Sequence, residues 1–335
     1  MKDLNGREAY LRRTATIPAY LLTFVVSVIV IPLVLPVVFI VDLFWWRHFA
    51  LTRAWAVWLA YFGCEAVAIV VASWLWLAQR RNPEKYLRSL FALERWWART
   101  LFRVGVWTYG ITIKIEGGDS AANGPFVLLV RHVSPADNLF PVVFVADRHR
   151  IFPRMVINRS LLRDPSMDIV ANRLPNAFVR AGSKNSLQDI RKVAALARDL
   201  GPNDAVAIFP EGALFTPARR AESVMALRDG RDSELADKAE QLENVLLPHL
   251  GGTLALLNAA DNVDVVFCAH AGLDDAATYR AILGGAAIGT SLRLRFWRVA
   301  AADIPHGREA RSRWLLDEWS KLDQWVGEAL EGTVT

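Results

Sequence analysis

Two long uncharged stretches dominate the first quarter of the chain. Residues 17–41 carry no charge, and residues 54–78 carry a single one, Glu65. About 20 apolar residues are enough to cross a bilayer, whereas the apolar part of a cleavable signal peptide is roughly 7–15 residues long. The pattern therefore predicts an N-terminal two-helix transmembrane hairpin, with helices at about 17–41 and 54–78. Prolines would kink the first helix, at Pro18, Pro32 and Pro36.

Glu65 interrupts the second apolar stretch. A carboxylate at membrane depth is often functional. We favour a structural role, in which the carboxyl group is protonated or pairs with the first helix.

Basic residues cluster outside the two apolar stretches. Four precede the first stretch and seven lie between residues 80 and 103, against two in the link at 42–53. Because basic flanks tend to stay in the cytoplasm, we expect both ends of the hairpin to face it. The sequence thus predicts a multi-pass integral membrane protein, of the inner membrane in a bacterium, with a cytoplasmic catalytic domain.

Residues 84–107 have the periodicity of an amphipathic helix. Arginines 88, 95, 99 and 103 fall on one face, and leucine, phenylalanine and tryptophan fall on the other. Such a helix can lie in the headgroup layer or pack on a domain in the ordinary way. The adjoining apolar stretches favour the first. We therefore expect a membrane hairpin and its flank over 1–83, an interfacial amphipathic helix over 84–107 and a cytoplasmic catalytic domain over 108–335.

From residue 108 onward, short apolar stretches alternate with helical periodicity. This order predicts an α/β fold with a largely parallel sheet flanked by helices. The charged segment 217–241 is predicted to be a mobile surface insertion that ends in a helix. Strands are expected at 112–115, 126–130, 155–157, 177–179, 205–209, 263–268 and 291–299, and helices at 186–200 and 308–330.

Composition strengthens the membrane interpretation. Hydrophobic residues make up 53% of the 335 positions, with 13 tryptophans, and the mean hydropathy is positive. The net charge of +5 suits an anionic membrane surface or an anionic ligand. No nucleic-acid motif accompanies it, so no nucleic-acid partner is expected. Cys64 and Cys268 lie far apart in apolar stretches and indicate neither a disulfide framework nor a thiolate metal site.

The candidate chemistry lies in one turn, where His132 and Asp137 follow the predicted strand 126–130. In α/β sheets, ligands usually bind at the carboxyl ends of strands. A neutral imidazole can take a proton from an alcohol, and a nearby carboxylate can orient the imidazole and stabilise its cation. A simpler interpretation is also open, because Ser134 and Asp137 have the spacing of a helix capping box.

A second stretch, Phe209-Pro210-Glu211-Gly212, also follows an apolar strand. The pattern H-x-x-x-x-D followed about seventy residues later by F-P-E-G resembles the glycerophospholipid acyltransferases, which act on 1-acylglycerol-3-phosphate and other lysophospholipids. The resemblance covers about residues 127–271, and the layout is most similar to the lysocardiolipin-type branch. It implies acyl transfer from acyl-CoA or acyl carrier protein to a lysophospholipid hydroxyl at the bilayer, without cofactor or metal.

The resemblance also implies roles for single residues. His132 matches the family's base and Asp137 its orienting carboxylate, with no covalent intermediate, so that Ser134 is left to cap the helix. Phe178-Val179-Arg180 matches the second motif and implies that Arg180 binds the acceptor's phosphate, with Lys184 as a helper. Outside this family an arginine after a strand is usually a solvated surface residue. Glu211 and Gly212 match the third motif and are expected to bind substrate.

Two motifs depart from the family pattern. Ala213 and Leu214 stand where threonine and arginine commonly follow, which takes away one phosphate ligand of lysophosphatidate enzymes. The strand at 263–268 lacks the proline of the fourth motif, so no catalytic residue is assigned to it. His270 is expected to be a partly buried histidine at the end of this strand.

Other classes of protein fit less well. The sequence has no G-x-S-x-G elbow of a serine hydrolase, and its glycines at 284–289 are not followed by a Walker lysine. His132, Asp137 and Glu211 are residue types that zinc accepts, but no other feature supports a metal site. One alternative stays open, a membrane-anchored lipid-binding or scaffold protein that keeps the fold without catalysis.

Overall fold

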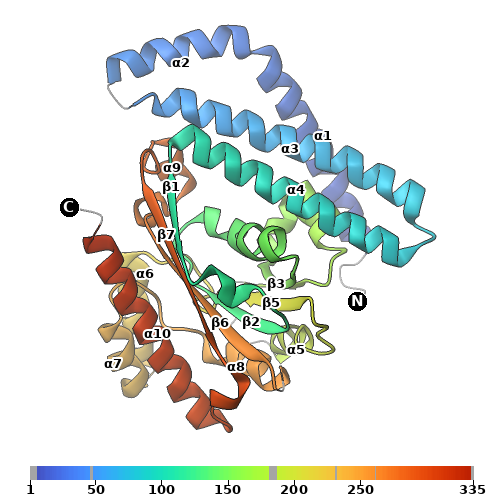
Figure 1. Ribbon diagram of the computed structural model, residues 1–335. Coiled ribbons are helices and arrows are strands. Elements are labelled where there is room, and N and C mark those ends of the chain that lie inside the picture. Colours follow the sequence, from blue (N-terminus) through green and yellow to red (C-terminus); the bar gives the residue numbers. More distant parts are fainter. Residues whose placement is uncertain (1–5, 46–47, 181–186, 231, 261, 333–335) are drawn as a thin grey trace.

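A mixed β-sheet forms the centre of the protein, and helices cover both of its faces (Figure 1). The computed structural model describes residues 6–45, 48–180, 187–230, 232–260 and 262–332, and within these the sheet has seven strands. The strands are β1 (Thr112–Glu116), β2 (Phe126–Val130), β3 (Phe152–Asn158), β4 (Ala177–Val179), β5 (Asp204–Ile208), β6 (Asp264–Ala271) and β7 (Ser291–Val299).

The strand order is β1-β7-β6-β2-β5-β3-β4. Strands β6, β2, β5, β3 and β4 run parallel to one another, whereas β7 pairs antiparallel with β6 and parallel with β1. The carboxyl ends of β2, β5, β3 and β4 therefore lie along one edge of the sheet. The predicted α/β class with a largely parallel sheet is confirmed.

Strand β2 shows why the sheet has helices on both sides. All its residues are buried, as expected for a central strand of a parallel sheet. Leu128 and Val130 point into a core that includes Trp97 and Phe140, while Val127 and Leu129 point into a core with Trp319 on the other side.

The helices divide between these two sides. The second core is covered by α5 (Leu187–Ala195), α8 (Leu250–Ala259) and α10 (Arg308–Glu331). On the first side lie α4 (Pro83–Tyr109), two short helical turns, η2 (Pro135–Leu139) and η3 (Pro141–Asp147), and α9 (Tyr279–Leu283). The segment predicted to be a mobile insertion instead forms α6 (Pro217–Asp229) and α7 (Ser233–Gln241), which pack against each other. That prediction was wrong in part, because small residues such as Ala236 and Ala239 form a buried helix face where few large apolar residues are present.

The N-terminal stretches form α1 (Gly6–Ile29), α2 (Ile31–Trp45) and α3 (Ala50–Gln79), stacked outside α4 (Figure 1). The apolar stretch 17–41, predicted to be one helix kinked at its prolines, is divided between α1 and α2, which meet at a 70° bend at Val30. Pro32 lacks the N–H that would continue the helix, and it disfavours helical backbone in the residue before it. Within the described part of the chain, α3 is the one helix long and apolar enough to cross a membrane, or one of two if the bent pair forms a span.

Helix α3 lies along the rest of the protein and does not project from it. The Arg53 side chain donates to the carbonyl of Thr108, and the Tyr61 hydroxyl donates to Asp164. Glu65 is fully buried and accepts from the Trp97 indole at 2.8 Å and from the backbone of Ser166 at 3.0 Å. Its role is therefore structural, as expected, but these partners lie in α4 and the sheet domain and not in the first helix.

Helix α4 coincides with the predicted amphipathic segment. Its apolar residues, among them Leu90 and Trp97, are buried between α3 and the sheet domain, while Trp107 is 84% exposed. The apolar face is thus already covered by protein, and a headgroup-layer position for this helix stays a prediction.

Candidate active site

The turn after β2 brings the predicted base and carboxylate together. The His132 Nδ1 atom lies 3.4 Å from Oδ2 of Asp137, without the alignment of a hydrogen bond. Catalytic hydrogen bonds are often long before substrate binds. The His132 side chain is 14% exposed and the Asp137 side chain is fully buried. Nδ1 is the ring nitrogen next to the carboxylate, so Nε2 is the nitrogen left to accept a proton.

Asp137 fits both interpretations that the sequence left open, since it lies next to His132 and also caps a helical turn. Its Oδ2 atom accepts the backbone N–H groups of Val133 at 2.6 Å and of Ser134 at 2.7 Å, which completes a capping box at η2. Burial alone would raise the pKa of Asp137, but His270, His132 and the Ser134 amide together lower it below its ordinary value. The carboxylate is therefore ionised and fixed in position next to His132.

Glu211 holds the base from the other side. Its side chain is buried, with Oε1 accepting from the backbone N–H of His132 at 2.7 Å and Oε2 from that of Leu246 at 2.8 Å. Both oxygens accept backbone N–H groups, so Glu211 holds the turn that carries the base, and its predicted substrate-binding role stays a prediction. Burial raises the pKa of Glu211 to about 8.

The residues on either side of Glu211 also support the site. The Phe209 ring packs on the His132 imidazole, with centroids 4.3 Å apart. Gly212 has φ +66°, and a Cβ atom there would lie 2.5 Å from the His249 ring. Glycine is therefore required by backbone conformation and by a close side chain, and its predicted role towards the substrate stays a prediction.

Arg180 lies at the same edge of the sheet as His132, but farther along it. It follows β4, its side chain is exposed, and its backbone N–H lies 3.4 Å from the Asp189 carboxylate. Strand β4 is three positions from β2 in the sheet, a separation of roughly 14 Å at about 4.8 Å per strand. An arginine side chain and a lipid headgroup would have to span this gap together. Lys184, the predicted helper, lies outside the described residues.

The sequence did not indicate a second cation beside the base, Arg219. The Phe215 N–H donates to the carbonyl of His132 at 2.7 Å, so the segment after Gly212 runs beside the base. Arg219, at the start of α6, donates from Nη1 to the carbonyl of Leu214 at 2.9 Å, and the residue is exposed. A guanidinium group is thus present next to position 214, where the family's arginine is missing. Its only signal in the sequence is a basic residue five positions later.

The sequence also did not indicate that His270 and Arg131 lie at the site. His270 is fully buried, not partly as expected, because β6 is a central strand paired with β2. Arg131 is fully buried as well and donates to the carbonyl of Asn244, to the carbonyl of His270 and to Asp274, the last at 2.6 Å. The residue directly before the base is therefore bound to two separate segments.

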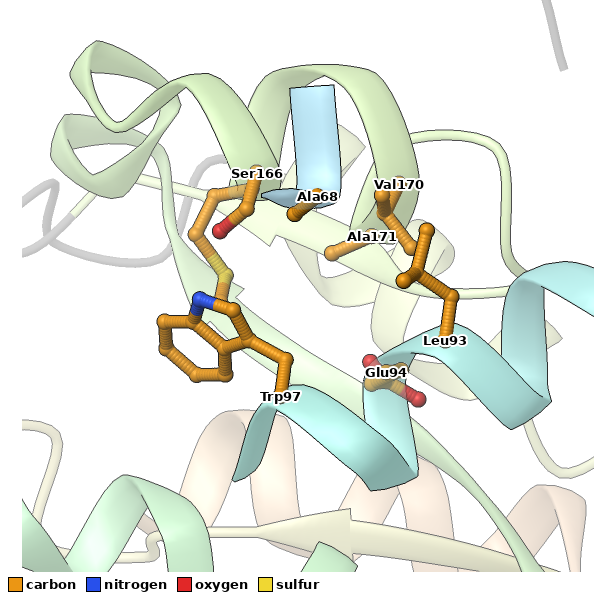
Figure 2. A pocket seen from close by; sticks show the side chains of 8 residues that line it. Ala68, Leu93, Glu94, Trp97, Ser166, Val170 and Ala171 are labelled. Atoms are coloured by element: carbon orange, nitrogen blue, oxygen red, sulfur yellow. The ribbon is translucent and has the colours of Figure 1, made fainter. Parts of the chain in front are cut away.

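A small, mainly apolar cavity lies away from this site, between α3, α4 and the turn after β3 (Figure 2). Trp97, Met167 and Val170 line it together with the Glu94 carboxyl group, whose pKa is raised by burial to about 8. No predicted site residue lines it, so this cavity belongs to the contact between the N-terminal helices and the domain. Among the described residues, no group of three or more His, Cys, Asp and Glu side chains could hold a metal ion.

Comparisons with known proteins agree with this geometry. Residues 112–270 match the family model described as Acyltransferase. The fold is similar to the crystal structure of the 1-acyl-sn-glycerophosphate (LPA) acyltransferase PlsC from Thermotoga maritima, with a TM-score of 0.51 and 15% identity over 83% of this chain and 97% of that chain. No curated protein matches the sequence. The matched segment contains both the His132–Asp137 turn and the Glu211–Gly212 motif, so this part of the chain is similar to acyltransferases, and the fold is similar to that of a 1-acyl-sn-glycerophosphate acyltransferase.

Proposed function

We propose that the protein transfers an acyl group from a thioester, acyl-CoA or acyl carrier protein, to the hydroxyl of a lysophospholipid such as 1-acyl-glycerol-3-phosphate. The observation that carries the proposal is the His132–Asp137 pair at the end of β2, with the carboxylate buried and held by two backbone amides. The family supplies the reaction type, and this pair supplies a base for a hydroxyl acceptor.

In the proposed reaction, Nε2 of His132 takes the proton from the acceptor hydroxyl while its oxygen attacks the thioester carbonyl. Asp137 stabilises the imidazolium that forms. A C–O bond forms, the C–S bond breaks, and the proton on His132 passes to the leaving thiolate. Ser134 is unsuited as a nucleophile, because its hydroxyl is buried and donates to the carbonyl of Ala276 at 2.8 Å.

The experiment gives purified full-length protein in lipid vesicles a panel of lysophospholipids, each with acyl-CoA or acylated carrier protein, and measures the released thiol. We expect turnover by the natural protein and background rates for His132→Ala. This variant should fold, because it is the backbone of His132, and not its ring, that binds Glu211 and Phe215. Vesicle binding without turnover in any combination would instead support the lipid-binding or scaffold alternative.

For the acceptor, we propose that Arg180 and Arg219 bind the phosphate. Arg180 matches the arginine of the family's second motif. Arg219 lies beside position 214, where leucine replaces the family's arginine. A guanidinium group offers paired donors that match a phosphate.

For the membrane, we propose that the outward faces of α1–α3 attach the domain to the cytoplasmic face of the bilayer. Val70 is 63% exposed and Leu77 65% exposed on α3, while the opposite face contacts α4 and the domain. Because α3 lies along the domain, a full crossing would draw the domain into the hydrocarbon layer. Accessibility tags at the amino terminus, within residues 42–53 and after Thr335 test this. The two terminal tags should report the cytoplasm; a 42–53 tag on the far side would show a transmembrane hairpin.

A further inference from the structure

Asp137 has an imidazole on each of two sides. His132 Nδ1 lies 3.4 Å from its Oδ2 atom, and His270 Nε2 lies 3.5 Å from the same oxygen. His270 comes from β6, which pairs with β2, so the two histidines approach the carboxylate from neighbouring strands. The Phe140 ring packs edge-on against His270, with centroids 4.9 Å apart, and helps to fix the imidazole.

The contacts of His270 determine where its proton lies. Its Nε2 atom is 2.9 Å from the carbonyl oxygen of Arg131. A carbonyl and an ionised carboxylate only accept hydrogen bonds, so the proton is on Nε2; it is donated to the Arg131 carbonyl, with the Asp137 oxygen 3.5 Å from the same nitrogen. The carbonyl of His270 accepts in return from Nη1 of Arg131 at 2.7 Å. His270 is thus bound through both its side chain and its backbone to the residue that precedes the base.

The charges around His270 leave it as a neutral donor. The turn after β2 contributes Arg131, His132 and Asp137, and Asp274 from the segment after β6 pairs with Arg131 at 2.6 Å. On β6 itself, burial raises the pKa of the Cys268 thiol well above its ordinary value, so the thiol is uncharged. Burial also lowers the pKa of His270. The imidazole therefore places the positive end of its N–H dipole 3.5 Å from Asp137 without adding a positive charge.

We infer that His270 is a positioning residue for acyl transfer: its Nε2–H binds the Arg131 carbonyl and lies next to Oδ2 of Asp137, so that the carboxylate that faces His132 keeps its position. This inference rests on the proposed function. Without that N–H, the carboxylate would keep the two backbone amides and would bind the His132 imidazolium more strongly. A base that is protonated more readily loses activity at low pH, so the acid limb of the kcat/KM profile should move to higher pH.

The test compares His270→Leu, which removes the donor, with His270→Gln, whose amide N–H can replace Nε2–H. Cys268→Ala is the matched control, because it disturbs the same face of β6 and removes no charge. For His270→Leu we expect kcat to fall about tenfold and the acid limb to rise by roughly half a pH unit, since only one donor of several is lost. His270→Gln and Cys268→Ala should keep the natural acid limb, and the acceptor's KM should not change in any of the three.

A second measurement does not depend on turnover. Diethyl pyrocarbonate acylates the neutral imidazole, and the modification of His132 against pH can be followed by mass spectrometry of its peptide. Its midpoint should move to higher pH in His270→Leu and stay in His270→Gln. An unchanged midpoint in His270→Leu, or equal losses of activity in both His270 variants without any shift, overturns the inference. If the midpoint shifts in His270→Leu but the natural protein shows no turnover, the result would instead count against the proposed function.

Discussion

The base side and the acceptor side of the proposed site are built in different ways. On the base side, Asp137 and Glu211 are buried, and Oδ2 of Asp137 and both oxygens of Glu211 accept backbone N–H groups. On the acceptor side, Arg180 and Arg219 are exposed at the edge of the sheet. Proton transfer requires a base already held in place when the substrate arrives, whereas an exposed guanidinium group can form its bonds to a phosphate on binding.

This difference has a consequence for substitutions. Residues that hold the same base act together, so the losses of activity caused by substituting each of them should not add. Groups that bind the phosphate should change the acceptor's kinetic constants and leave those of the thioester donor alone. The predictions below test each side of this contrast, beginning with the largest effect.

The largest effect is expected for Asp137→Asn. Asparagine keeps one oxygen to accept from Val133 and Ser134, so the cap at η2 should persist, but it cannot stabilise the His132 imidazolium. We expect kcat to fall by about 10⁴ if the carboxylate acts as in a serine-protease triad. Combining it with His132→Ala should cost nothing beyond His132→Ala alone. Steady-state kcat of the two single variants and the double variant checks this. If the loss in the double variant equals the product of the two single losses, the two residues act independently.

The next effect is expected for Arg180→Ala. A charge-assisted hydrogen bond contributes roughly 1.5–3 kcal/mol, so kcat/KM for the acceptor should fall about ten- to a hundredfold. Arg180→Lys should recover part of the loss, because lysine keeps the charge but not the paired donors. The measurement varies donor and lysolipid separately. A rise in the donor's KM alone would assign Arg180 to the donor site.

Arg219→Ala should have a smaller effect, about tenfold on the acceptor's kcat/KM, because one of its donors already binds the carbonyl of Leu214. Arg311→Ala is the matched control, since that arginine also binds backbone carbonyls but lies between α8 and α10. Lysolipids with and without a free phosphate monoester show whether the loss depends on the phosphate. Equal losses on both kinds of acceptor would mean that Arg219 only supports the α6 loop.

The sequence predicted those parts of the site that depend on local pattern. The apolar residues of β2 indicate a central strand, and the turn after it places His132 and Asp137 at the carboxyl edge. Glu211 was placed correctly after β5, but its bond to the N–H of Leu246 could not be predicted, because Leu246 lies 35 residues away in the sequence.

The features that were missed depend on strand pairing and packing. His270 reaches Asp137 because the register sets Cys268 opposite Val130, and no local spacing in the sequence encodes that pairing. For α3, hydropathy gave the length of an apolar helix but could not show that one face packs on α4 and the domain.

The smallest effect on activity is expected for Glu211→Gln, and here stability is the more informative measurement. Glutamic acid with its ordinary pKa of 4.5 ionises in the unfolded chain, whereas the folded protein keeps the proton until about pH 8. The contribution of this group to stability is therefore complete below about pH 4.5 and is lost as pH rises to about 8. Glutamine carries no such proton, so Tm should fall less between pH 5 and pH 8 in the variant. At pH 5 the variant should be less stable by about 1–3 kcal/mol, because its NH₂ group faces an N–H of His132 or Leu246. Thermal unfolding at both pH values, with the exposed Glu309→Gln as control, measures the difference; the same pH slope in Glu211→Gln and the natural protein would mean that Glu211 is ionised in the fold.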